Sequence, residues 1–135
     1  MKLNELMRDF GAWLGVADVP ADVDGTYQLD VGGLPIMLFE RDGQLTMLAT
    51  LGRLPQEGAG TLGWQMMEAM YMDEGSDGAT FSVDYEEECF CLQRRDPLAE
   101  TDVDGFIARF NGFAATAEKW RRLIADSQFA QQATD

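Results

Sequence analysis

Two cysteines are the residues of this sequence whose type and spacing first suggest chemistry. Cys89 and Cys91 lie two positions apart in a stretch that alternates like a β-strand, so their side chains project from one face, about 7 Å apart. A disulfide at this spacing would strain the backbone. A structural zinc site needs four ligands, and the chain has no further cysteine and no histidine. We therefore expect two buried, reduced cysteines, no bound metal and a reducing compartment.

A glycine motif also suggests a ligand. Gly58, Gly60 and Gly63 spell G-x-G-x-x-G ahead of a helical pattern. Dinucleotide-binding loops use this spacing because backbone amides can then approach a pyrophosphate. Here the preceding strand pattern ends well before Gly58, no parallel crossover follows, and the formal net charge of −14 disfavours a pyrophosphate. We interpret the glycines as a flexible loop that leads into the helix, and we expect no cofactor.

Carboxylates are abundant, but their pattern does not indicate a catalytic site. The acidic run at Asp84 and residues 86–88 is typical of solvated surface. The aspartate-rich loops at 17–25 and 101–105 lack the glutamate in register that an EF-hand calcium loop needs. Nucleophilic catalysis lacks its usual base because the chain has no histidine. We expect a protein that is not an enzyme; an acid-dependent hydrolase is the third hypothesis.

The charge balance limits the partners. With 24 acidic against 10 basic residues, the chain repels nucleic acid and anionic membranes, and we expect neither as a partner. No apolar run is long enough to cross a bilayer, and the N-terminal residues lack a signal-peptide core. We expect a cytoplasmic protein with a single domain over residues 1–126 and a frayed tail over residues 127–135.

The elements that must position these residues alternate in an α+β order. Gly32-Gly33 and Asp42-Gly43 predict tight hairpin turns between the first three strands. Gly15 predicts the end of the first helix, and Thr101 or Asp102 is expected to cap the last one. The order α-β-β-β-α-β-β-α predicts a twisted antiparallel sheet with helices packed on it. The helices are predicted over 2–15, 62–72 and 103–124, and the strands over 26–31, 34–40, 44–51, 79–87 and 88–95.

The helix predicted over residues 62–72 is apolar nearly all round. Its apolar residues cover roughly 220°, about twice the arc that a helix needs to dock on its own core. A second copy of the chain would cover the excess, so we predict a homodimer helix; a helix enclosed in the core of a monomer is the alternative. The two apolar arcs consist of Leu62, Met66, Ala69 and Met70, and of Trp64, Met67 and Tyr71.

A second apolar excess lies in the first half of the chain. Residues 34–39 are apolar on both faces, as in a central strand that is covered on two sides. The helices and a dimer partner supply only part of this cover. Apolar area beside an exposed strand edge can capture an extended peptide, with main-chain hydrogen bonds for affinity and pockets for alternate side chains.

The chain resembles the class I type III secretion chaperones, the CesT-like Tir chaperone family, in its whole order of elements. The motifs are "LG-x-LP" at 51–55, "PLA" at 97–99 and "AE-x-W" at 117–120. Asp96 is a departure, because the family often has a hydrophobic residue before "PLA", and the acids of "DYEEE" are a second one. The resembling segments are "LPIMLFERDGQLTMLATLGRLP" at 34–55, "LGWQMMEAMYM" at 62–72 and "CLQRRDPLAETDVDGFIARFNGFAATAEKWRRLI" at 91–124.

The resemblance implies a small homodimer in the bacterial cytoplasm that works without chemistry. It would bind the N-terminal chaperone-binding region of a secreted effector as an extended chain, keep it soluble and secretion-competent, and present it to the export ATPase. A YbjN-like interaction or regulatory domain on the same fold is the alternative. The effector-binding candidates are Leu6, Phe10, Trp13, Leu29, Met37 and Phe39. The dimer-interface candidates are Trp64, Met67, Met70 and Tyr71.

Overall fold

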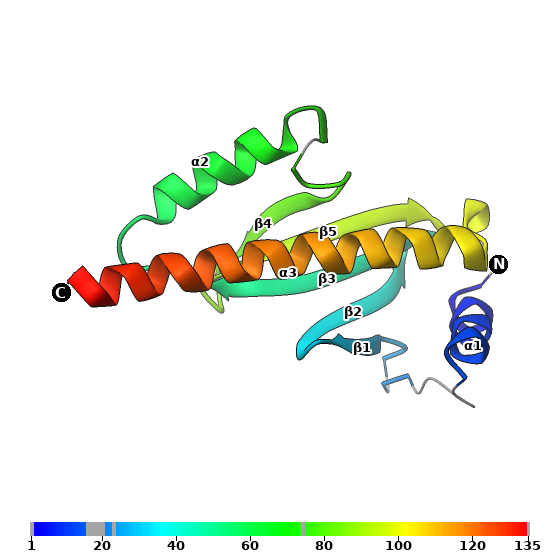
Figure 1. The fold of residues 1–135 in the computed structure, drawn as a ribbon. Helices are drawn as coiled ribbons and strands as arrows, with labels where there is room; N and C mark the ends of the chain where they lie inside the picture. The colour runs from blue at the N-terminus through cyan, green and yellow to red at the C-terminus, as the bar shows by residue number, and fades with distance from the viewer. Residues whose placement is uncertain (1, 16–20, 23, 74, 135) are drawn as a thin grey trace.

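The elements follow the predicted α-β-β-β-α-β-β-α order in residues 2–15, 21–22, 24–73 and 75–134, which are those that the computed structural model describes (Figure 1). The predicted α+β fold is therefore confirmed. The helices are α1 (Leu3–Leu14), α2 (Ala59–Met70) and α3 (Val103–Thr134), with short 3-10 turns η1 (Tyr71–Asp73) and η2 (Leu98–Glu100). The strands are β1 (Tyr27–Val31), β2 (Leu34–Arg41), β3 (Gln44–Arg53), β4 (Thr80–Asp84) and β5 (Cys89–Pro97).

The strands form one antiparallel sheet in the order β1-β2-β3-β5-β4, so β1 and β4 are its edge strands. The predicted turns at Gly32-Gly33 and Asp42-Gly43 join β1 to β2 and β2 to β3. Gly33 and Gly43 have φ of 85° and 75°, the left-handed conformation that glycine adopts without strain. The glycine turns therefore set the register of the first three strands.

Alternation along the strands gives the sheet two different faces. On the inner face the register places Tyr27 beside Leu38 and Leu38 beside Met47, and all three are buried. Helix α3 runs along the length of the sheet, and α1 lies beside the N-terminal end of α3 (Figure 1). Both helices contribute to the core with the inner face. On the outer face, Met37 and Thr50 stay exposed.

Aromatic packing joins α1 to α3. The ring of Phe10 meets that of Phe106 edge to face at 5.0 Å and that of Phe110 at 5.6 Å between centroids. Such pairs add about 1 kcal/mol to the free energy of area burial. Gly15 ends α1 in the left-handed conformation, as predicted, with φ of 78°.

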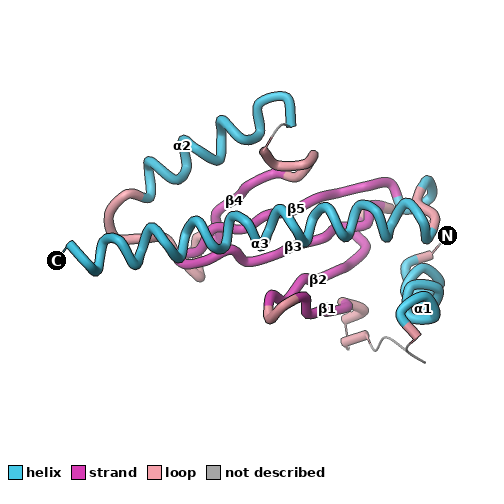
Figure 2. Tube along the Cα trace, viewed as in Figure 1, coloured by secondary structure: helices cyan, strands magenta, loops and turns pink. Residues whose placement is uncertain are grey.

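Helix α3 begins at the predicted residue and extends beyond the predicted end at residue 124. Asp102 caps the helix, because its Oδ1 accepts a hydrogen bond of 2.7 Å from the backbone N–H of Gly105. The helix continues to Thr134 as one unbroken rod (Figure 2). Residues 127–134 contain neither glycine nor proline, so nothing in them interrupts the helix. Fraying of this tail stays a prediction.

The glycine motif is placed differently from its prediction. Helix α2 begins at Ala59, so Gly60 and Gly63 lie inside it, and only Gly58 precedes it, with φ of 86°. The interpretation of all three glycines as a loop is wrong. Burial of Leu62 and Met66 supplies the tertiary packing that stabilises a helix of weak intrinsic propensity.

Candidate protein-binding surfaces

The outer side of α2 carries a group of large apolar residues that the protomer leaves exposed. Trp64, Met67, Tyr71 and Met72 are 66%, 64%, 72% and 75% exposed. Trp64 and Met67 are three positions apart and share one side of α2, and Tyr71 and Met72 follow directly in η1. We call these four residues the α2 surface. The opposite side of the helix holds Leu62 and Met66, which are buried.

Only part of the predicted dimer set lies on the α2 surface. Trp64, Met67 and Tyr71 do, whereas Met70 is half-buried and accepts a hydrogen bond at its sulfur from the backbone N–H of Phe81, at 3.5 Å. The indole N–H of Trp64 donates to Glu68 Oε1 at 2.6 Å. This bond satisfies the polar atom of Trp64 within the helix, which leaves the apolar part of the ring free for a partner.

The loop between α2 and β4 ties α2 to the rest of the molecule. The backbone N–H of Gly75 donates to Ala69 O at 2.8 Å, and the carbonyl of Gly75 accepts from the indole of Trp120 at 3.2 Å. Trp120 in turn packs edge to face on Phe81 of β4, with 4.9 Å between centroids. Gly75 thus links the end of α2 to α3. This link fixes the orientation of α2 and therefore the direction in which the α2 surface faces.

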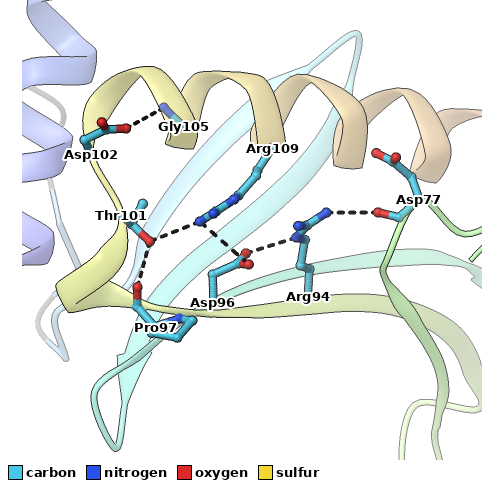
Figure 3. Close-up of polar contacts among 8 residues, drawn as sticks. All are labelled: Asp77, Arg94, Asp96, Pro97, Thr101, Asp102, Gly105 and Arg109. Atoms are coloured by element: carbon cyan, nitrogen blue, oxygen red, sulfur yellow. Dashed lines mark hydrogen bonds and ion pairs between the residues drawn. The ribbon is translucent and has the colours of Figure 1, made fainter.

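A second anchor of this loop is a polar network around Asp96 (Figure 3). Asp96 is 9% exposed; its Oδ2 accepts from Arg94 Nε at 3.0 Å, and Arg109 Nη1 of α3 lies 3.7 Å from its Oδ1. Arg109 also donates to the hydroxyl of Thr101, and Arg94 Nη1 donates to the carbonyl of Asp77 in the loop before β4. The network therefore joins β5, α3 and this loop.

Asp96 is a site that sequence reasoning noted only as a departure from the family pattern. Its spacing from Arg94 places both side chains on one face of β5, which is a signal in the sequence. Its proximity to Arg109, which belongs to α3, cannot be read from the sequence. The burial of the carboxylate is compatible with folding because two guanidinium groups compensate its charge.

The predicted effector-binding residues divide between the core and two surfaces. Leu6 and Phe10 are 0% and 3% exposed, because α3 covers the side of α1 that they occupy. We therefore correct their placement: in the protomer they are core residues and are not available to a client. Trp13, which is 59% exposed, stacks on Phe10 at 5.8 Å and remains on the surface.

The other three candidates lie on the first two strands. Leu29 is half-buried and pairs with Ile36 on the inner face of the sheet. Met37 and Phe39 belong to the outer face, where Met37 is 37% exposed and Phe39 is half-buried. The six candidates therefore do not form one patch. Sequence reasoning left out Leu14 and Val31, which are 49% and 39% exposed.

Met37 and Phe39 line a groove between β2 and the turn that precedes β1. The groove has a volume of about 450 Å³, and Asp22 and Asp24 lie on its loop side. The turn is held by hydrogen bonds from Asp22 N to Thr26 O and from Thr26 N to Asp24 Oδ1, at 2.8 and 3.1 Å. The bond from Thr26 lowers the pKa of the Asp24 carboxyl, so this group is charged at neutral pH.

The two cysteines lie in surroundings that disfavour a reactive thiolate. Cys89 and Cys91 are buried and free, as predicted. Burial, together with the neighbouring Cys91 and acidic groups, raises the pKa of the Cys89 thiol to about 11, so its reactive thiolate is scarce at neutral pH. The described residues hold no cluster of three metal-ligating side chains, and none of their helices is long and apolar enough to span a membrane.

Comparison with known proteins points to one family. The family model described as "Tir chaperone protein (CesT) family" matches residues 5–121. The match includes most of α1, the whole sheet, α2 and the N-terminal part of α3. A comparison with curated proteins finds no match.

Solved structures of similar fold include complexes of secretion chaperones. A chain of the crystal structure of the ExsC–ExsE complex has a TM-score of 0.74 and 20% identity, over 91% of this chain and 96% of that chain. The HopA1–SchA chaperone–effector complex gives 0.72 and 15%, over 87% and 91%. The Yersinia pestis type III secretion chaperone SycH, in complex with a fragment of YscM2, gives 0.71 and 12%, over 88% and 99%.

Proposed function

Because the chain belongs to the Tir chaperone protein (CesT) family, we propose that it is a type III secretion chaperone that binds the N-terminal segment of a secreted effector. The client is held as an extended chain, which keeps it soluble and competent for secretion. A solved structure of the same fold is a chaperone–effector complex, and this likeness supports an effector as the partner. We further propose that the chaperone presents its client to the export ATPase.

The observation that carries this proposal is the amount of apolar surface left uncovered on a folded protomer. The α2 surface alone presents four large apolar residues, each more than three-fifths exposed. Contiguous apolar surface of this kind marks sites of protein association in soluble proteins. We propose that a second copy of the chain covers the α2 surface in a homodimer. A symmetric dimer places the same surface of both copies in contact.

We propose that the client binds at the opposite edge of the sheet, at β1. Strand β1 is an edge strand; in the described residues its outer side pairs only through the bridge between Ala21 and Tyr27. An extended client can add main-chain hydrogen bonds along such an edge. Trp13 offers apolar area on α1, and Met37 and Phe39 offer it on the outer face of the sheet. We propose these three as client contacts.

The mechanism requires no covalent step. A disordered client loses conformational entropy when it is ordered on the chaperone, and burial of its apolar side chains offsets this loss. The client stays unfolded because it pairs with the chaperone surface instead of with itself. Release then requires only that another component compete for the same contacts.

Co-expression with an effector segment tests the proposal. The probe is the N-terminal segment of the secreted protein whose gene lies beside that of this chain, purified through a tag on the segment. We expect a complex that contains two copies of the chaperone, and we expect the Met37→Glu variant to retain less of the segment than the wild type. Retention of the segment is read by densitometry, and stoichiometry by sedimentation equilibrium.

The control for this experiment is Glu86→Gln in the turn between β4 and β5, an exposed position away from β2. It should leave retention unchanged. The proposal is contradicted when the wild-type chain does not retain the segment, or when it retains an unrelated globular protein of equal size just as well.

A further inference from the structure

The groove beside β2 combines an apolar floor with an acidic wall. Met37 and Phe39 line the floor, and Asp22 and Asp24 lie on the turn that faces it. Glu40 contributes a third carboxylate. A second hollow of about 340 Å³ at the start of α1 shares Asp24, Phe39 and Glu40 with the groove, so the two spaces meet at these residues.

Charges of both signs line the groove, and the negative ones predominate. Arg41 lies in the groove with Asp22, Asp24 and Glu40, and Lys2 lies in the adjoining hollow. All five side chains are exposed, and among the described residues no ion pair joins any two of them. The carboxylates are therefore available to a cation from a partner, within a molecule of net charge −14.

A long basic side chain is complementary to both parts of this groove. Lysine and arginine pack an aliphatic stem along apolar surface and keep a charged head in water. The stem fits the floor at Met37 and Phe39, while the head reaches the carboxylates of the turn. An acidic or purely apolar segment would satisfy only one of the two parts.

We propose that the groove beside β2 selects client segments in which a lysine or arginine lies within two positions of an apolar residue. This inference rests on the proposed chaperone function and names the chemistry of the segment that this groove accepts. Exposed ion pairs contribute little affinity, but charge complementarity determines which segments bind and how fast. The groove thus acts on client choice more than on total affinity.

A selection from random peptides tests the proposal without a known client. The probe is a displayed library of random twelve-residue peptides, selected against the wild type, against the double variant Asp24→Asn with Glu40→Gln, and against a control. Asparagine at position 24 keeps an oxygen that can accept the hydrogen bond from Thr26 N. The control is Glu86→Gln with Glu87→Gln, which removes the same charge from the turn between β4 and β5.

We expect wild type and control to enrich peptides with lysine or arginine near an apolar residue, and the groove variant to lose the basic preference while keeping the apolar one. For one enriched peptide, fluorescence anisotropy should show an affinity about 3- to 10-fold lower for the groove variant, and the difference should shrink in high salt. Equal basic enrichment by the groove variant would overturn the inference alone. Absence of any enriched peptide with the wild type would contradict both the inference and the proposed function.

Discussion

Met72 is strained in the protomer and exposed at the same time. Its φ of 55° is in the left-handed region, which costs a residue with a Cβ atom roughly 1–2 kcal/mol. The side chain is 75% exposed, so contacts within the protomer do not compensate this cost. Strained residues that persist in folded proteins often serve binding. Met72 belongs to the α2 surface, so contacts with a partner at this surface would compensate its conformational cost.

Replacement of Met72 by glycine should therefore have opposite effects on folding and on self-association. We expect the free energy of unfolding to rise by about 1 kcal/mol, since glycine adopts this conformation freely. We expect the dimer to weaken, because the side chain is lost from the interface. Urea unfolding of the Trp64→Glu background, which should be monomeric, measures the first effect, and sedimentation of the single variant measures the second.

Glu88 provides the matched control for this prediction. It has φ of 53° in the turn between β4 and β5 and is exposed. Glu88→Gly should stabilise the chain without changing self-association. If Met72→Gly and Glu88→Gly both stabilise the chain and neither changes dimerisation, Met72 does not belong to the interface.

The carboxylate of Asp96 should be needed for stability, because it is the anion shared by two arginines. Asp96→Leu leaves Arg94 and Arg109 without their anion in a partly buried place, and we expect a loss of about 1–3 kcal/mol. Urea unfolding checks this value. Adding Arg109→Met to Asp96→Leu should recover part of the loss, because it removes one uncompensated charge. If Asp96→Leu leaves the free energy of unfolding unchanged, the network does not contribute to stability.

At the scale of the element, helix α2 depends on the loop that follows it. Few of its own residues are buried, and its orientation comes from contacts of Gly75 with Ala69 and Trp120. A Cβ atom on Gly75 would lie 2.8 Å from the Cβ and 3.1 Å from the Cα of Ala69. Glycine is thus required here by close approach of two backbone segments. The position of the α2 surface depends on this approach.

Gly75→Ala should destabilise the chain by about 1–3 kcal/mol, because the end of α2 must move to admit the methyl group. The control is Gly60→Ala inside α2, where a Cβ atom would meet nothing within 4 Å. That change should be neutral or stabilising by up to about 1 kcal/mol, since alanine favours the helix. Thermal unfolding and hydrogen exchange of α2 amides measure both. A Gly75→Ala variant as stable as Gly60→Ala would show that the loop adapts freely.

At the scale of the whole molecule, association must overcome repulsion between like charges. Each copy carries a net charge of −14. Two copies therefore repel each other, and salt should strengthen the dimer by screening this repulsion. In the proposed homodimer, burial of the apolar α2 surface supplies the opposing attraction. A net charge of this size favours solubility of a chain that exposes apolar surface.

Trp64→Glu should dissociate the dimer, because burial of an unpaired carboxylate at an interface is costly. Sedimentation velocity at micromolar concentration should show a monomer for this variant and a dimer for the wild type. Val31→Glu, at the other end of the sheet and also exposed, is the control and should remain dimeric. If Trp64→Glu sediments as a dimer, the interface does not include the α2 surface.

The sequence by itself determined the order of elements, the hairpin turns and the apolar excess of α2. These features follow from periodicity and from turn residues such as Gly33 and Gly43, which act over a few positions. Local pattern also predicted Gly15 as the end of α1 and narrowed the cap of α3 to Thr101 or Asp102, between which the structure selects Asp102.

Only the tertiary structure decided which apolar residues remain exposed. Leu6, Phe10 and Trp13 belong to one helical pattern, yet α3 covers the first two and leaves Trp13 free. The pairing of Asp96 with Arg109 and the groove beside β2 likewise join residues from separate elements. Periodicity states which residues share a side of an element. Burial depends on what packs against that side, and this is set by contacts between segments that are distant in the chain.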